Sequence, residues 1–202
     1  MDVNPYLNTK TLILGDINSG KTTLTGSVLK ALCLQGHGNR TAVVDMAPTI
    51  PETLARQKGL PGVGGKIFCP EGESVLYLDG YFEAPRLSSA TEAEAIEKAR
   101  NNWKAINGLF HRLRDTSNRD ILLINDISMY LQCGAADALI AWIAPISTVI
   151  ANGYWGEKLG GGALTQWERA EMHRLRAYFE ANGSILMPPF SNTFDALVSG
   201  KL

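Results

Sequence analysis

At residues 15–22 the chain reads Gly15-Asp16-Ile17-Asn18-Ser19-Gly20-Lys21-Thr22, which matches the pattern G-x-x-x-x-G-K-[ST]. The residues before it, 11–14, form an apolar run typical of a β-strand. After it, Leu24, Val28, Leu29 and Leu32 recur at the spacing of one helical face. A strand, a glycine-containing turn and a helix in this order are the context of a phosphate-binding loop, and this stretch therefore predicts one.

The residue types of this loop explain how it would hold phosphate. Glycines let successive backbone N–H groups turn toward phosphate oxygens at the positive end of the helix dipole. Lys21 adds a cation for the β- and γ-phosphates, which makes it a predicted catalytic residue, and the Thr22 hydroxyl can ligate Mg²⁺. The predicted nucleotide contacts are Gly15, Asn18, Ser19, Gly20, Lys21, Thr22 and Thr23.

Length and composition narrow the class of protein. The chain has 202 residues and a formal net charge of −1, which suits one α/β domain over residues 1–202 and argues against a general polyanion binder. Its three cysteines are far apart and lack C-x-x-C spacing, as is typical of a reduced cytoplasmic protein. The apolar stretch 135–151 contains Asp137 and Pro145, and it predicts a helix and a strand rather than a membrane span.

Apolar strand-like runs alternate with helical segments along the chain. The predicted strands are 11–14, 41–44, 121–124, 147–151 and 184–187, with a further strand or hairpin at 74–78. This alternation predicts a three-layer α/β/α fold of the P-loop NTPase type with a mostly parallel sheet. Residues 47–89, rich in glycine and proline, interrupt the rhythm and are predicted to form an insertion or lid.

Two capping boxes mark the predicted starts of long helices. Thr91 with Glu94 opens the first, and Thr165 with Glu168 opens the second. The pair Asn182-Gly183 is a plausible stop for the second helix. Both helices are long enough to cover a face of the predicted sheet.

Aspartates follow two of the predicted strands. The run Ile121-Leu122-Leu123-Ile124-Asn125-Asp126 has the form of a buried strand with a carboxylate beyond its tip. Such a carboxylate faces the phosphates and can hold Mg²⁺ directly or through water, so Asp126 is a predicted metal-site residue. The run Thr41-Ala42-Val43-Val44-Asp45 is a second strand that ends in an aspartate, soon after the first helix.

This order of phosphate loop, helix and strand-end aspartate resembles the SIMIBI class of nucleotide-driven ATPases and GTPases. The resemblance implies that Asp45 is a catalytic residue that helps to organise Mg²⁺ and the attacking water. The chain is also similar to the RNA-processing polynucleotide 5′-hydroxyl kinases. The stretches that carry this likeness are Val43-Val44-Asp45-Met46-Ala47-Pro48, Pro61-Gly62-Val63-Gly64-Gly65, Ala84-Pro85-Arg86-Leu87 and Ile124-Asn125-Asp126.

The sequence gives a weaker indication of the base and of other anion contacts. Asn152 follows the predicted strand 147–151, where a side chain can contact a nucleotide base, but no Asn-Lys-x-Asp guanine signature is in register. ATP or GTP is therefore the predicted substrate, with ATP slightly favoured. Lys66 and Arg86, with Arg56 and Lys58, lie in the insertion and are candidates to meet an anionic substrate or the γ-phosphate.

Three functions fit these features. The first is a Mg²⁺-dependent ATP or GTP hydrolase that acts as a switch on a partner protein, or as a homodimer. The second is a small kinase, in which Asp45 is the base and residues 47–89 form the acceptor site. The third is a nucleotide-binding regulatory protein with little turnover. The phosphate loop is common to all three.

Overall fold

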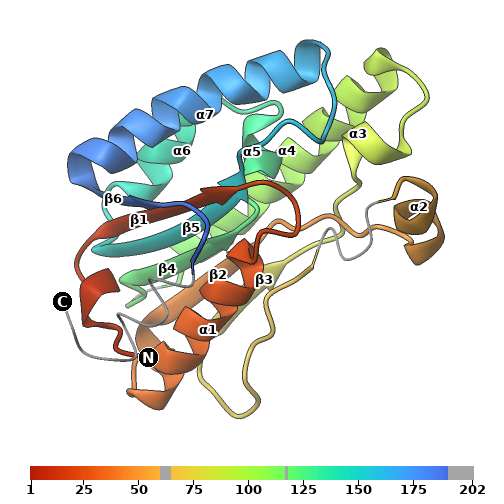
Figure 1. Cartoon of the computed structure of the whole chain (residues 1–202). Coiled ribbons are helices and arrows are strands. Elements are labelled where there is room, and N and C mark those ends of the chain that lie inside the picture. The colour runs from red at the N-terminus through yellow and green to blue at the C-terminus, as the bar shows by residue number, and fades with distance from the viewer. Residues whose placement is uncertain (60–64, 117, 191–202) are drawn as a thin grey trace.

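A computed structural model describes residues 1–59, 65–116 and 118–190. Six strands form one all-parallel sheet in the order β3-β2-β4-β5-β1-β6 (Figure 1). The strands are β1 (Lys10–Gly15), β2 (Thr41–Asp45), β3 (Leu76–Asp79), β4 (Ile121–Asn125), β5 (Thr148–Tyr154) and β6 (Gly183–Leu186). The predicted three-layer α/β/α fold of the P-loop type is therefore confirmed.

Helices cover the two faces of the sheet unequally. Helix α1 (Lys21–Leu34) lies on one face, as Figure 1 shows. The opposite face carries α4 (Glu92–Arg114), α5 (Ser128–Leu131), α6 (Ala136–Ile143) and α7 (Ala163–Asn182). The remaining helices are short: η1 (Asn4–Tyr6), η2 (Gly38–Arg40), α2 (Glu52–Gln57) and α3 (Pro85–Ser88).

Side-chain alternation along the central strands divides the core in two. In β4, Ile121 and Leu123 pack toward α1, whereas Leu122 and Ile124 pack toward the opposite layer. The neighbouring strands alternate in the same way, because successive residues of a strand point to opposite faces. This period-2 rule also decides which residue at the end of each strand reaches the α1 side.

Most of the predicted elements are present with small shifts at their ends. The five predicted strands correspond to β1, β2, β4, β5 and β6, and the predicted helix Ala136–Ile143 is α6. The prediction of a strand or hairpin at 74–78 becomes a single edge strand, β3, which pairs in parallel with β2. The predicted insertion 47–89 therefore contains a strand of the sheet in addition to α2 and α3, while its residues 60–64 lie outside the described residues.

One predicted capping box is confirmed and the other is wrong. The Glu94 backbone N–H donates to Thr91 Oγ1 at 3.2 Å, and the Glu94 carboxylate accepts from Ala90 N–H at 2.8 Å. Helix α7, however, begins at Ala163, so Thr165 lies inside the helix. The Glu168 carboxylate pairs with the Arg86 guanidinium instead of closing a box. A long-range ion pair has thus replaced the local contact that the sequence predicted.

Helix α1 offers a test of how much its contact with the sheet contributes to stability. Leu29 is fully buried, whereas Leu34 at the end of the same helix is 77% exposed. We expect Leu29→Ala to lower the free energy of unfolding by about 2–5 kcal/mol, because it leaves a cavity between helix and sheet. Leu34→Ala should change it by less than about 0.5 kcal/mol. Urea denaturation of both variants checks this, and equal losses would contradict the assigned packing.

Candidate functional site

The phosphate loop connects the end of β1 to the start of α1. Asn18 and Gly20 both have positive φ angles, of 56° and 88°, so the chain turns through left-handed backbone on its way into the helix. A glycine suits the second of these positions, because an L side chain is strained there. No side chain caps the N-terminus of α1, and its first turn holds no acidic residue. The backbone donors and the positive end of the helix dipole therefore favour an anion.

The Lys21 ammonium is folded back over this loop. Its Nζ donates to the Asp16 carbonyl oxygen at 2.6 Å and to Ser19 Oγ at 3.4 Å. Burial lowers the pKa of Lys21, while the negative charges of Asp126 and Asp16 oppose that shift. A partly desolvated cation that donates to a carbonyl and a hydroxyl interacts strongly with any anion that enters the loop.

A cavity of about 820 Å³ opens above the loop. It is lined by the loop, by one side of α1, by residues of segment 65–70 and by the ends of two strands. Of the predicted site residues, it brings together Asn18, Ser19, Gly20, Lys21, Thr22, Thr23, Asp126 and Asn152. Gly15 and Asp45 are not among the described residues that line it. Gly15 ends β1, and Asp45 ends β2 next to Asn125.

Behind the cavity, three polar side chains form a row across the sheet. Asp45 of β2 and Asn125 of β4 are paired in register, and Asn152 of β5 continues the row. Asn125 Nδ2 donates to Asp45 Oδ1 at 2.9 Å, and Asn152 Nδ2 donates to Asn125 Oδ1 at 2.9 Å. All three residues are buried, so these hydrogen bonds act in a low-dielectric setting where an unpaired group is costly.

The polar row is connected to the start of α1. Thr22 Oγ1 donates to Asn125 Oδ1 at 3.4 Å, and Asn152 Nδ2 also donates to Thr25 Oγ1 at 2.9 Å. Thr25 Oγ1 in turn donates to the Lys21 carbonyl oxygen at 2.9 Å. The predicted metal ligand Thr22 is thereby held in place by strand residues as well as by its own helix.

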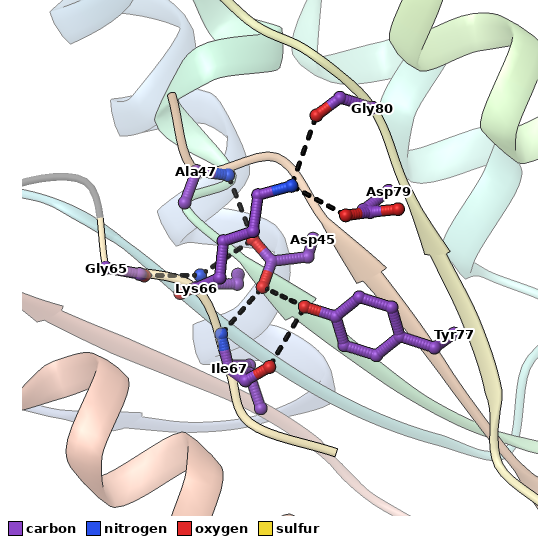
Figure 2. Close-up of polar contacts among 9 residues, drawn as sticks. Asp45, Ala47, Gly65, Lys66, Ile67, Tyr77, Asp79 and Gly80 are labelled. Atoms are coloured by element: carbon purple, nitrogen blue, oxygen red, sulfur yellow. Dashed lines mark hydrogen bonds and ion pairs between the residues drawn. The ribbon is translucent and has the colours of Figure 1, made fainter. Parts of the chain in front are cut away.

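Asp45 uses both carboxylate oxygens inside the protein. Oδ1 accepts from Ala47 N–H at 3.0 Å and from Asn125, and Oδ2 accepts from Ile67 N–H at 2.7 Å and from the Tyr77 hydroxyl at 2.7 Å (Figure 2). Burial, followed by the bond to Asp45, raises the pKa of Tyr77 far above its usual range. This geometry favours an anchoring role for Asp45, and its predicted catalytic role stays a prediction.

Asp126, the residue after Asn125, occupies a different environment from that of Asp45. Its φ of 56° turns the chain after β4, and its carboxylate accepts from Ser128 Oγ at 2.8 Å. Burial raises the pKa of Asp126, while the hydrogen bond from Ser128 and the charges of Lys21 and Arg86 lower it. A carboxylate with a raised pKa beside the phosphate loop has the character of an acid or base in a reaction.

Asn125 is the site residue that sequence reasoning missed. The apolar run predicts a strand that ends at Ile124 and a carboxylate beyond its tip at Asp126, whereas β4 ends at Asn125. Alternation contains the missing signal: Asn125 has the parity of Ile121 and Leu123, which face α1. A polar residue with that parity at the carboxyl end of the strand has to meet the start of α1, where Thr22 lies.

Asn152 was predicted to contact the base. In the structure its Oδ1 accepts from the Asp126 backbone N–H at 3.0 Å, and its Nδ2 donates to Asn125 and Thr25. These bonds use both ends of the amide and fix the turn that carries Asp126. The geometry therefore favours a supporting role for Asn152 beneath the phosphate loop, and its base contact stays a prediction.

Two cations of the predicted insertion, Lys66 and Arg86, are held by carboxylates of β3 and α7, whereas Arg56 pairs with Glu52 of its own helix α2. The Arg86 guanidinium pairs with Glu168 and lies over the Tyr154 ring, 5.7 Å from its centroid. Lys66 Nζ donates to Asp79 Oδ2 at 2.6 Å and to the Gly80 carbonyl oxygen at 3.2 Å, so its ammonium is held at the end of β3 (Figure 2). Of the two, only Lys66 lines the cavity among the described residues.

The donor set fits magnesium bound together with phosphate better than a metal held by protein alone. Within residues 1–59, 65–116 and 118–190 no group of three or more His, Cys, Asp or Glu side chains is arranged to hold a metal. The Thr22 hydroxyl, the Asn125 amide oxygen and the Asp126 carboxylate are hard oxygen donors near the loop. Mg²⁺ takes one or two such ligands and completes its shell with phosphate oxygens and water.

Comparisons with known proteins do not identify a family for this chain. No protein-family model matches the sequence, and neither does any curated protein. Among solved structures, the flagellar accessory protein FlaH from Methanocaldococcus jannaschii aligns with 82% of this chain and 68% of its own, at 12% identity and a TM-score of 0.40. The all-parallel sheet with a phosphate loop between β1 and α1 is consistent with a P-loop fold, whereas the resemblance to the SIMIBI class and to the polynucleotide kinases finds no support in these comparisons. No helix of the described residues has the length and apolarity needed to cross a bilayer.

The polar row requires an amide at residue 125, because this side chain both donates to Asp45 and accepts from Asn152. Asn125→Asp would replace the amide group 2.9 Å from Asp45 Oδ1 with a second carboxylate oxygen. We expect a loss of about 2 kcal/mol or more in unfolding free energy at neutral pH, because two buried carboxylates cannot both ionise. One carboxyl of the pair then has a raised folded-state pKa, so the loss should shrink as the pH falls toward 4.

Urea denaturation at pH 7.5 and pH 5 measures this effect. Asn101→Asp, the same change at an exposed position of α4, is the matched control and should be nearly neutral at both pH values. A loss for Asn125→Asp that is independent of pH would show that charge repulsion within the row is not its cause.

Proposed function

We propose that the protein binds a nucleoside triphosphate with Mg²⁺ and hydrolyses its terminal phosphate, acting as a switch on a partner protein or a second copy of the chain. The observation that carries the proposal is the meeting, in one cavity, of the uncapped phosphate loop, the Lys21 ammonium and the half-buried Asp126 carboxylate. The first two suit a polyphosphate, and the third suits a reaction at its end.

In this proposal each group of the loop has one task. The backbone N–H groups at the start of α1 hold the phosphates, and Lys21 exchanges its bonds to Asp16 and Ser19 for bonds to the β- and γ-phosphate oxygens. The Thr22 hydroxyl and the Asn125 amide oxygen would hold Mg²⁺. When bound, the ion would neutralise charge on those phosphates. Asn125 keeps the Thr22 hydroxyl in position.

We assign the base to Asp126 rather than Asp45. Both oxygens of Asp45 are occupied by donors of the protein, whereas Asp126 lines the cavity and has a raised pKa. In the reaction, a water oxygen forms a bond to the terminal phosphorus as the bond to the bridging oxygen breaks. Asp126 takes the water proton, and Lys21 stabilises the charge that remains on the leaving diphosphate.

The connection of Thr22 to segment 65–70 supports the switch role. Asn125 accepts from Thr22 through Oδ1 and donates through Nδ2 to the Gly65 carbonyl oxygen at 3.0 Å. A change in the bonds of the Thr22 hydroxyl therefore reaches the backbone of this segment through one side chain. Order or displacement of a loop in response to a terminal phosphate is a common form of nucleotide switching.

The binding half of the proposal is tested by Lys21→Ala. We expect ATP or GTP with Mg²⁺ to raise the melting temperature of the wild-type chain, because a ligand that binds only the native state stabilises it. Lys21→Ala should lose most of that rise, while Lys104→Ala, an exposed lysine of α4, should keep it. Differential scanning fluorimetry measures both, and a wild-type protein that shows no rise with either nucleotide refutes the proposal.

The reaction half is tested by Asp126→Asn. Phosphate release from Mg²⁺-nucleotide should fall by about 10²–10⁴-fold, the usual contribution of a general base, while nucleotide affinity is retained. Loss of the Mg²⁺ dependence of binding would instead make Asp126 a metal ligand, as the sequence predicts. Unchanged turnover would exclude both roles. Release that requires an added acceptor would favour a kinase, and binding without any turnover would favour a regulatory protein.

A further inference from the structure

The cavity extends well beyond the phosphate loop, along one side of α1. Thr23, Gly26, Ser27 and Lys30 line it at the spacing i, i+3, i+4, i+7, which is a single helical face. At 1.5 Å per residue this face is about 10 Å long. The residues on it are small until Lys30 ends it with a cation, so the backbone of the helix borders the groove closely.

The opposite wall of the groove comes from segment 65–70. Lys66, Ile67, Phe68 and Pro70 line it; Ile67 Cγ2 lies 4.0 Å from a Cβ placed at Gly26, so segment 65–70 meets α1 there and Ile67 forms the floor of the groove. Hydrogen bonds to its backbone anchor this wall from behind, one of them from the Tyr77 hydroxyl to the Ile67 carbonyl oxygen at 2.9 Å. Ile67 N–H donates to Asp45 at 2.7 Å, and the Gly65 carbonyl accepts from Asn125 at 3.0 Å (Figure 2).

Phe68 is the aromatic side chain of this wall and is 76% exposed. The cavity has a second aromatic residue, Tyr154, at its other end. Tyr154 is already in use, because its ring lies under the Arg86 guanidinium and its hydroxyl accepts from Leu159 N–H at 3.0 Å. Phe68 therefore offers an open aromatic face beside a groove whose opposite side is a helix with a glycine.

We propose that this groove binds a nucleobase and that the Phe68 ring stacks on it. The inference rests on the proposed function, since the phosphate loop supplies the anchor from which the nucleoside extends. A volume of about 820 Å³ lies in the range of sites that enclose a whole small-molecule ligand, and the α1 face gives the base a path away from the phosphates past Thr23. Stacking on an aromatic ring accepts any nucleobase, and this chain lacks an Asn-Lys-x-Asp guanine signature in register.

The experiment compares ligands with and without a base. Titration calorimetry on the full chain with Mg²⁺ uses ATP, GTP and inorganic tripolyphosphate. Phe68→Ala should weaken ATP and GTP by about tenfold or more, the usual loss when a stacking aromatic is removed, and should leave tripolyphosphate unchanged. Phe68→Trp should restore the affinity. Tyr81→Ala removes an aromatic residue of similar exposure, 74%, that is not among the described lining residues, and should change nothing.

A further arm identifies the source of the base. Adenosine is titrated into the protein saturated with non-hydrolysable ATP and, separately, with tripolyphosphate. If adenosine shows Phe68-dependent binding only to the protein that holds tripolyphosphate, the groove normally takes the base of the nucleotide itself. If adenosine also binds to the protein that holds ATP, the groove takes a second nucleoside. The first result supports the proposal, and the second, which leaves the base of the bound nucleotide elsewhere, overturns it.

Failure of this inference can be separated from failure of the proposed function. If ATP and tripolyphosphate both bind to the wild type and Phe68→Ala weakens neither of them, while adenosine shows no Phe68-dependent binding, the base site is refuted and the phosphate loop stands. If tripolyphosphate and ATP both fail to bind to the wild type, the proposed function itself is refuted. A Phe68→Ala protein that loses tripolyphosphate as well would assign Phe68 to the shape of segment 65–70, and this too refutes stacking.

Discussion

The hydrogen bond between Asn125 and Asp45 is the contact on which the rest of the site depends. It joins two neighbouring parallel strands at their carboxyl ends, inside the protein, where a carboxylate cannot remain without donors. Asp45 accepts hydrogen bonds from four donors. Two of them, the Ile67 N–H and the Tyr77 hydroxyl, belong to the segment that runs from residue 65 into β3. The electrostatic requirement of one buried aspartate thus determines where that segment runs.

From this contact the network extends in two directions. Toward α1, the Asn125 oxygen reaches Thr22, and Asn152 reaches Thr25, so the start of the helix is set against the strand ends. Toward the edge of the sheet, Tyr77 of β3 and the backbone at Gly65 and Ile67 are fixed in place. A networked arrangement of this kind is more rigid than its separate pairs, because each bond orients the group that makes the next.

Local patterns in the sequence predicted most of the fold. Apolar runs located the strands, and glycine followed by Lys21-Thr22 located the loop, because strand periodicity and loop backbone geometry are properties of neighbouring residues. The site was harder to predict. Asn125 is the last residue of β4 and Asp126 begins the turn after it, so their different positions depend on where the strand ends. The bond between Asp45 and Ile67 spans 22 residues, and no local pattern contains it.

The error at Thr165 has the same origin. The pattern Thr165–Glu168 is suitable for a helix start, but Glu168 is buried in the structure and is paired with Arg86, 82 residues away. A buried carboxylate and a buried guanidinium each need the other, since neither is stable there alone. Tertiary pairing of charges therefore overrode a local preference worth about 1 kcal/mol.

The unequal covering of the sheet has a consequence for local motion. One face is protected by four helices, whereas the other is covered by α1 together with irregular segments that include Ile67 and Phe190. We expect amide protons of this thinner layer to exchange with solvent through openings of lower free energy than global unfolding. A molecule that bridges the start of α1 and segment 65–70 closes that layer from outside, and so slows amide exchange in strands that it never touches.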